Sequence, residues 1–274
     1  MAENSQKRTF LILTVFISLV AVGLTVASFA TDNWVTFSGG KLNTTGCKNS
    51  TNIGCKVEGN FGLFTGQYVI NYGFGDRQRS VQAICSDGWC INYSWTPVTN
   101  EDSNKIKQGG KNELKSLVQN YTETGNLEDW QYGLFRFGFW VGVIVLFSIA
   151  MVWGLVSIGF TVFNIFGKPI ETITGPLGLY LWNLLALLFS LIGVILYAAL
   201  FQTNFAKNVL PYSDYEQTFR TEGHTKLDFS YYFTIGSLVG YMANLILLMF
   251  SGYRLRCVCT QEADKAIDNG IILY

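Results

Sequence analysis

The residues best suited to covalent chemistry are the six cysteines, which fall into two groups. Four lie in a long stretch between two apolar segments, and two follow the last apolar segment. An oxidising compartment would pair the first group as disulfides, whereas a reducing cytosol would leave the second as thiols or allow their palmitoylation. The first group is Cys47, Cys55, Cys85 and Cys90, and the second is Cys257 and Cys259.

The pairing of the first group is suggested by the stretch CSDGWC. Its Asp-Gly dipeptide is a type I′ turn signal, which would place Cys85 opposite Cys90 in a two-residue hairpin. A non-hydrogen-bonded pair of this kind has Cα atoms about 4.5 Å apart, near the lower limit for a disulfide. We therefore predict Cys85–Cys90, which leaves Cys47 with Cys55. The crossed pairings remain an alternative.

The same long stretch carries four N-x-Ser/Thr sequons, none with proline in the middle. Sequons are acceptors of N-linked glycans on the luminal or extracellular side of a membrane. Their concentration between the first two apolar segments indicates an outer loop. The predicted acceptors are Asn43, Asn49, Asn92 and Asn120.

The final residues, GIILY, offer a possible binding motif. Ile272 and Tyr274 would share one face of an extended strand, with Leu273 between them on the other. A PDZ domain captures such an end by strand addition and holds the terminal carboxylate in backbone N–H groups. A PDZ scaffold is therefore a predicted partner.

Catalytic and metal-binding chemistry are not indicated. The chain has one histidine, His224, and shows no nucleophile elbow, phosphate-binding glycine loop or cluster of metal ligands. Its formal net charge is zero, which gives no basic field for nucleic acid. We expect no enzyme, no cofactor and no nucleic-acid partner.

The composition instead indicates a lipid environment. Hydrophobic residues make up 49% of the chain and charged residues only 14%, below the roughly 25% of soluble domains. Four apolar segments without ionisable residues are long enough to cross a hydrocarbon core of about 30 Å as helices. They are residues 10–30, 137–163, 179–201 and 233–253.

Positive residues at the flanks set the orientation. Lys7, Arg8, Lys168, Arg254 and Arg256 all fall on one side of four crossings, which is cytosolic by the positive-inside rule. The sequence thus predicts a multi-pass plasma-membrane protein with both termini in the cytosol. The connecting segments are residues 1–9, 164–178 and 254–274 on the cytosolic side, and 31–136 and 202–232 on the outer side.

The outer loop 31–136 is predicted to contain short strands. Aromatic and β-branched residues in FGLFTGQYVINYGF and SVQAICSDGWCINYSW favour a sheet. The polar stretch TNEDSNKIKQGGKNELKSLVQN indicates a mobile insertion with one short helix. The fold class is therefore a mainly α membrane protein, a four-transmembrane-helix bundle with a small extracellular β-sheet in the first outer loop.

Glycines and prolines shape the bundle. In the cytosolic turn, Gly167 can end one helix in a left-handed conformation, while Gly175 and Pro176 can begin the next. Within the spans, Asn183 and Asn244 are the strongly polar side chains, which we interpret as interhelical hydrogen-bonding groups. Small-xxx-small pairs predict close helix packing, with self-association through an outer face as the alternative. These pairs are Gly138 with Gly142 and Gly236 with Gly240.

The sequence resembles the clarin family. The resemblance is carried by FGKPIETITGPLGLYL, close to the clarin signature between the second and third spans, and by FGLFTG followed by YGFGDR. More distantly, Trp34, the Gly62-Leu63-Phe64 segment and the pair Cys85 and Cys90 are similar to elements of the claudin group, although Phe64 stands where claudins have tryptophan. The signature residues are Gly167, Lys168, Pro169, Glu171, Gly175 and Pro176.

The resemblance implies a non-enzymatic plasma-membrane protein that organises membrane and actin cytoskeleton in the protrusions (stereocilia) and synapses of sensory hair cells. Its roles would lie in perception of sound, balance or light. The expected partners are the lipid bilayer, PDZ scaffolds and actin-linked proteins. The alternatives are an auxiliary subunit of a channel or transporter and a claudin-like adhesion or barrier protein.

Overall fold

A computed structural model describes residues 2–42, 55–97, 103–124, 127–167 and 175–250. Several predicted sites therefore lie outside the described residues, and the structure does not address them. They are Asn43, Asn49, Cys47, Lys168, Pro169, Glu171, Cys257, Cys259, Ile272, Leu273 and Tyr274.

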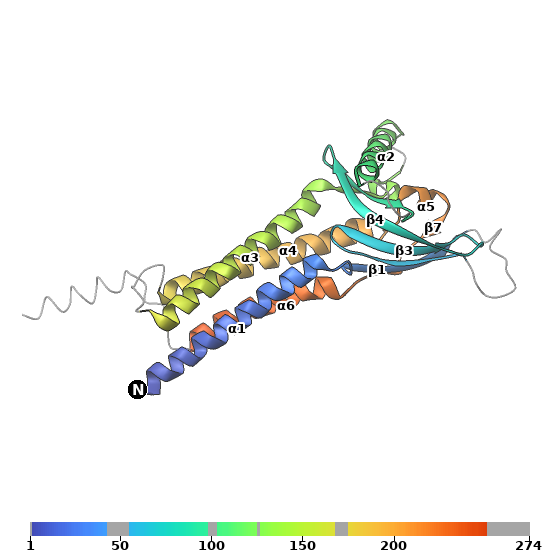
Figure 1. The fold of residues 1–274 in the computed structure, drawn as a ribbon. Helices are drawn as coiled ribbons and strands as arrows, with labels where there is room; N and C mark the ends of the chain where they lie inside the picture. Colours follow the sequence, from blue (N-terminus) through green and yellow to red (C-terminus); the bar gives the residue numbers. More distant parts are fainter. Residues whose placement is uncertain (1, 43–54, 98–102, 125–126, 168–174, 251–274) are drawn as a thin grey trace, which may run out of the picture.

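Four long helices form an elongated bundle (Figure 1). Each is long and apolar enough to cross a membrane, which confirms the mainly helical, four-span prediction. Helix α1 packs against α6 and α3, and α4 packs against α3 and α6. The helices are α1 (Ala2–Ala30), α3 (Phe137–Phe166), α4 (Pro176–Leu200) and α6 (Phe229–Phe250).

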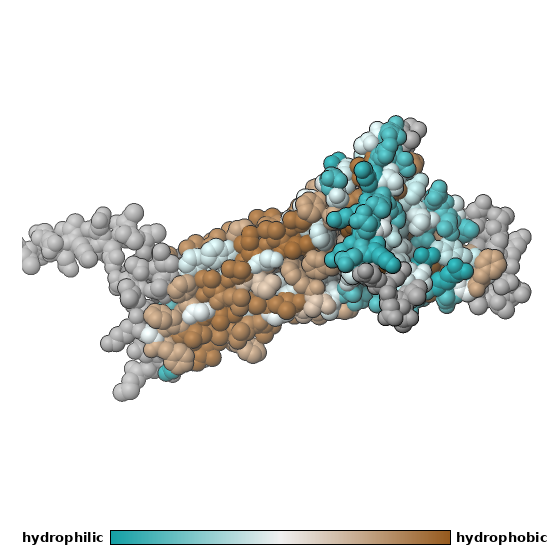
Figure 2. Space-filling view, turned by 45° about the horizontal axis from the view of Figure 1, so that its top comes forward, coloured by the Kyte–Doolittle hydropathy of each residue, from teal (hydrophilic) through white to brown (hydrophobic). Residues whose placement is uncertain are grey.

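The outer surface of the bundle is apolar along its length, whereas the sheet end is hydrophilic (Figure 2). Large apolar side chains face outward from every helix, among them Phe16 (63% exposed), Ile195 (59%) and Met249 (65%). A contiguous apolar surface of this kind is not tolerated in water and is covered by lipid in membrane proteins. The chain is a multi-pass membrane protein.

Several helix ends differ from the sequence-based expectation, among them Gly167 and the start of α6. Gly167 is extended, with φ −95° and ψ 173°, so the predicted left-handed conformation is wrong; its N–H still donates to Phe163 O at 2.7 Å. Helix α6 begins at Phe229, four residues before the predicted start, and Asp228 precedes it. The Asp228 carboxylate accepts the N–H of Phe229 at 2.7 Å, and its carbonyl accepts that of Tyr231 at 3.0 Å.

An eight-stranded antiparallel sheet stands on one end of the bundle, opposite the N-terminus (Figure 1). Its order is β6-β5-β4-β3-β2-β1-β7, and β8 also pairs with β1. The strands are β1 (Val35–Lys41), β2 (Lys56–Phe61), β3 (Thr65–Asn71), β4 (Asp76–Ser86), β5 (Trp89–Trp95), β6 (Leu134–Arg136), β7 (Phe219–Arg220) and β8 (Thr225–Leu227).

This sheet is larger than predicted from the first outer loop alone. Strands β7 and β8 come from the connection between α4 and α6, and both pair with β1. The same connection contains a π-helical turn, η2 (Phe201–Phe205), and the short helix α5 (Tyr212–Glu216). Short polar strands such as Thr225–Leu227 carry little pattern of their own and are stabilised by pairing with a neighbour.

The polar insertion is also more ordered than predicted, since it forms a 22-residue helix, α2 (Ser103–Thr124). Leu114 and Leu117 are buried on the sheet against Ile91, with the short helix η1 (Asp129–Tyr132) alongside. A Cβ at Gly110 would lie 2.2 Å from the Ile84 Cδ1 atom. The glycine therefore lets the helix approach the sheet closely.

Candidate functional site

The junction of the sheet with the bundle gathers most of the predicted residues. One hydrophobic core runs without interruption from the sheet strands into the helices. Trp34 lies at its centre and is fully buried. Its indole N–H donates to Ser28 O at 2.8 Å, and its ring centroid is 4.5 Å from that of Tyr197 and 6.0 Å from that of Phe147. Trp34 thus joins the start of β1 to α1, α3 and α4.

The Gly62-Leu63-Phe64 segment forms the second contact of the junction. Trp140 of α3 donates its indole N–H to Leu63 O at 2.8 Å, and its ring packs edge-on against Phe64 at 5.9 Å. A Cβ at Gly62 would lie only 2.6 Å from Asp32 Cα, so this position admits glycine alone without a shift of the backbone. The segment therefore connects the sheet to the first turn of α3 through Trp140.

The β4–β5 hairpin carries the disulfide. Cys85 and Cys90 are bonded, with Cα atoms 4.1 Å apart, and the register places these two residues opposite each other. Asp87 and Gly88 have φ of 52° and 83°, as a type I′ turn requires. Cys55 is also disulfide-bonded, but its predicted partner falls outside the part of the chain that the structure describes.

A buried carboxylate ties the two connections together. Asp214 of α5 accepts hydrogen bonds from the Tyr68 hydroxyl at 2.5 Å and the Tyr72 hydroxyl at 2.6 Å, both from the β3 region. Burial, the hydrogen bond to Asp214 and its negative charge raise the pKa of Tyr72 to about 12. Burial and the negative charge of Asp214 raise the pKa of Tyr68 even more. Burial, and to a smaller extent the same negative charge, also raises the pKa of Glu113. Sequence reasoning did not single out this cluster.

Asn183 and Asn244 form a polar layer inside the bundle, and both are fully buried. Asn183 donates to Ser157 Oγ of α3 at 2.7 Å, and Asn244 donates to Ser18 Oγ of α1 at 2.7 Å and to Asn183 Oδ1 at 3.2 Å. The layer therefore links all four long helices. This geometry agrees with the interpretation of both asparagines as interhelical hydrogen-bonding groups.

The predicted packing glycines divide into two kinds. A Cβ at Gly142 would meet Leu196 Cδ2 at 2.8 Å, and Cβ atoms at Gly236 and Gly240 would meet α1 at 3.2 and 3.1 Å. Gly138 has no atom within 4 Å of such a Cβ, so it does not mediate packing within the described chain. Its prediction as a residue that packs helices within the chain is therefore wrong, whereas the alternative, self-association through an outer face, stays a prediction.

Among the described glycines at contacts between the long helices, Gly154 has the shortest such distance, and sequence reasoning missed this residue. A Cβ there would lie 2.4 Å from the Tyr241 hydroxyl oxygen of α6 and 2.9 Å from Val22 Cγ2 of α1. Gly154 and Ala150 form a small-xxx-small pair, and this spacing was the available signal.

The two described sequons differ in accessibility. Asn120 is exposed on α2 and remains a predicted glycan acceptor. Asn92 is only 5% exposed, and its Nδ2 donates to Val209 O at 3.0 Å. Because a glycan on this buried nitrogen would have no room inside the fold, the folded structure contradicts Asn92 as an acceptor. Among the described residues, no group of three His, Cys, Asp or Glu side chains could hold a metal ion.

The comparison with protein families concerns the second half of the chain. A family model described as Clarin-2 (Clarin-2-like) matches residues 134–256, from β6 through the last span. This part of the chain is similar to the clarin family. The matched range contains α3, α4, α6 and the connection between α4 and α6, and it excludes α1, α2 and β1 to β5.

Parts of individual clarins are also similar to this chain, mostly at modest sequence identity. Human Clarin-1 is 25% identical over 135 residues, covering 49% of this chain and 58% of that protein. Mouse Clarin-3 is 23% identical over 133 residues, covering 47% and 59%. Human Clarin-3 is 38% identical over 63 residues, covering 23% and 28%. The matches thus span less than two thirds of the length of these relatives.

Proposed function

We propose that this clarin relative is a non-enzymatic tetraspan organiser, in which the sheet presents a binding surface on the cell exterior. The observation that supports this most is the shared core, in which Trp34 is fully buried between the first strand and three helices. A sheet fixed to the bundle in this way transmits a contact made outside the cell directly to the helices.

The orientation is part of the proposal. The Cys85–Cys90 disulfide lies in the sheet, and disulfides persist in oxidising compartments. The N-terminus is at the opposite end of the bundle, as a cytosolic terminus requires (Figure 1). Antibody access tests it: a tag in the α2 segment should be reached on intact cells, and an N-terminal tag only after permeabilisation. The reverse pattern would refute the orientation.

We further propose that the cytosolic side connects to actin, as the resemblance to clarins implies for stereocilia and synapses. Ile272 and Tyr274 would bind a PDZ scaffold, and Cys257 and Cys259 would carry palmitate. Proximity labelling from the carboxyl end in sensory cells should enrich PDZ and actin-linked proteins. A variant without residues 272–274 should lose the PDZ proteins, and equal labelling by both forms would refute the tail as the contact.

Adhesion between cells is the second candidate function. It is favoured by the gathering of Trp34, the Gly62-Leu63-Phe64 segment and the Cys85–Cys90 hairpin in one junction, since these are the elements similar to claudins. Expression in non-adherent cells distinguishes the two candidates: aggregation of expressing cells supports adhesion, and actin recruitment without aggregation supports the organiser. Conductance from the purified, reconstituted protein alone would instead favour a channel role.

A further inference from the structure

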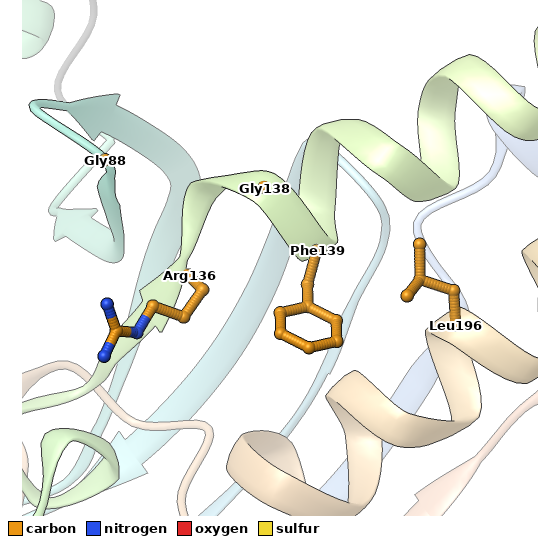
Figure 3. Close-up of a pocket in the computed structure, with 5 residues that line it drawn as sticks. All are labelled: Gly88, Arg136, Gly138, Phe139 and Leu196. Carbon is orange, nitrogen blue, oxygen red and sulfur yellow. The ribbon is translucent and has the colours of Figure 1, made fainter.

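A groove of about 580 Å³ opens where the sheet meets the outer face of the bundle (Figure 3). It is lined by the β4–β5 turn at one end and by α3 and α4 at the other. Figure 3 shows Arg136 at the sheet end and the Phe139 ring and Leu196 on the bundle side. The lining residues are Gly88, Arg136, Gly138, Phe139 and Leu196.

Arg136 places a positive charge at the boundary of the hydrocarbon region. It is the residue immediately before α3, and all 30 residues of that helix form one candidate membrane span. Its guanidinium carbon lies 4.0 Å from the centroid of the Trp89 ring, an arrangement that fixes the planar group by cation–π stacking. Within the described chain, Arg136 forms no ion pair with a carboxylate. The charge is therefore available to an anion from outside the protein.

The remainder of the groove is apolar and open. Phe139 is 42% exposed, and no atom lies within 4 Å of a Cβ built at Gly138. At about 1.5 Å per residue, Phe139 lies roughly 4 to 5 Å deeper along α3 than Arg136. The groove thus changes from cationic to apolar in the direction of the membrane interior.

We propose that this groove binds one phospholipid, with the phosphodiester on Arg136 and an acyl chain along Phe139 and Leu196. The planar guanidinium presents paired N–H donors that match phosphate oxygens. Free phosphate would leave the apolar half of the groove without a contact, and an apolar transmembrane helix from a second copy would leave the Arg136 charge without a partner. The proposal rests on the helices crossing a bilayer and is independent of adhesion or actin binding.

Native mass spectrometry of the full chain in detergent tests the proposal. The added lipid is palmitoyl-oleoyl phosphatidylcholine, compared with the diacylglycerol of the same chains and with inorganic phosphate. Wild type should retain the phospholipid but neither comparator. Arg136→Gln should weaken retention about tenfold, the effect of losing one charged hydrogen-bonding group. Arg77→Gln is the control, since Arg77 also stacks on an aromatic ring, that of Tyr72, but lies on the sheet.

A second variant tests the apolar half without touching the charge. Gly138→Leu should fill the groove and reduce retention by a similar factor, whereas Gly23→Leu, at another open helix position, should not. Thermal unfolding of each variant verifies that the fold is kept. Equal phospholipid retention by wild type and Arg136→Gln would overturn the proposal, as would equal retention of diacylglycerol. Retention of inorganic phosphate without retention of the phospholipid would also overturn the proposal. So would dimer formation that Gly138→Leu abolishes while the retention of phospholipid is unchanged.

Discussion

The indole N–H of Trp34 donates to the carbonyl oxygen of Ser28 across 2.8 Å, which fixes the first residues after α1 to the last turn of that helix. Replacement of Trp34 by alanine leaves a large cavity in the shared core. We expect the free energy of unfolding to fall by about 3 to 5 kcal/mol, as for other buried aromatic residues. Thermal or chemical unfolding in mild detergent measures the loss.

Phe74 provides the control for this change because its side chain is 90% exposed. Phe74→Ala should alter the unfolding free energy by less than about 0.5 kcal/mol. If the two variants proved equally stable, Trp34 would not anchor the sheet to the bundle.

The Asp214 cluster predicts a dependence of stability on alkaline pH. The pKa of Tyr72 is about 12 in the folded protein and that of an unperturbed tyrosine is 10.0, so the unfolded chain loses this proton first. The stabilising contribution is complete below pH 10 and is lost as the pH rises through 12. Tyr72→Phe should therefore show a shallower decline between pH 10 and 12 in denaturation profiles. Parallel declines for wild type and variant would contradict the assignment.

The two described sequons predict different glycan occupancy. Asn120→Gln should increase gel mobility by one glycan, because Asn120 is exposed on α2. Asn92→Gln should leave the mobility unchanged, because the Asn92 side chain is buried inside the fold. Enzymatic removal of N-glycans should bring all forms to the same mobility. A shift caused by Asn92→Gln would show that this side chain is accessible when the glycan is added.

Two glycines on α3 provide a matched test of helix packing. Gly154→Leu would collide with Tyr241 and Val22, whereas Gly159 has open space around it. We expect Gly154→Leu to cost at least 1 to 3 kcal/mol, the usual penalty of overpacking, and Gly159→Leu to be nearly neutral. Surface yield and the unfolding midpoint of the purified protein measure both. Similar losses of surface yield and of unfolding midpoint in the two variants would contradict a close helix crossing at Gly154.

The helices could be predicted from sequence because their signal is local. Twenty or more apolar residues without an ionisable group admit few structures other than a membrane span. The Asp-Gly turn likewise specifies its own hairpin, since the register that joins Cys85 to Cys90 follows from two residues between them. The start of α4 at Gly175 and Pro176 was also predicted correctly, because the signal again lies in adjacent residues.

The missed features depend on contacts between distant segments. Asp214 lies in a short polar stretch with no strong pattern, and its role appears only when α5 meets Tyr68 and Tyr72. The tyrosines at these positions were a weak signal for a buried acceptor. Asn92 fits the sequon rule, but the rule does not report burial. Gly138 fits the small-xxx-small rule, but the rule does not say which face of the helix is covered.

The strand order determines when the chain can complete its sheet during synthesis. Thr36 of β1 hydrogen-bonds with Asp228, which is 192 residues later in the sequence. Until the ribosome has made β7 and β8, one edge of β1 has no partner, and exposed edges invite pairing with other chains. A nascent chain arrested before the last helix would therefore present an adhesive strand, which quality-control chaperones could recognise as a mark of unfinished assembly.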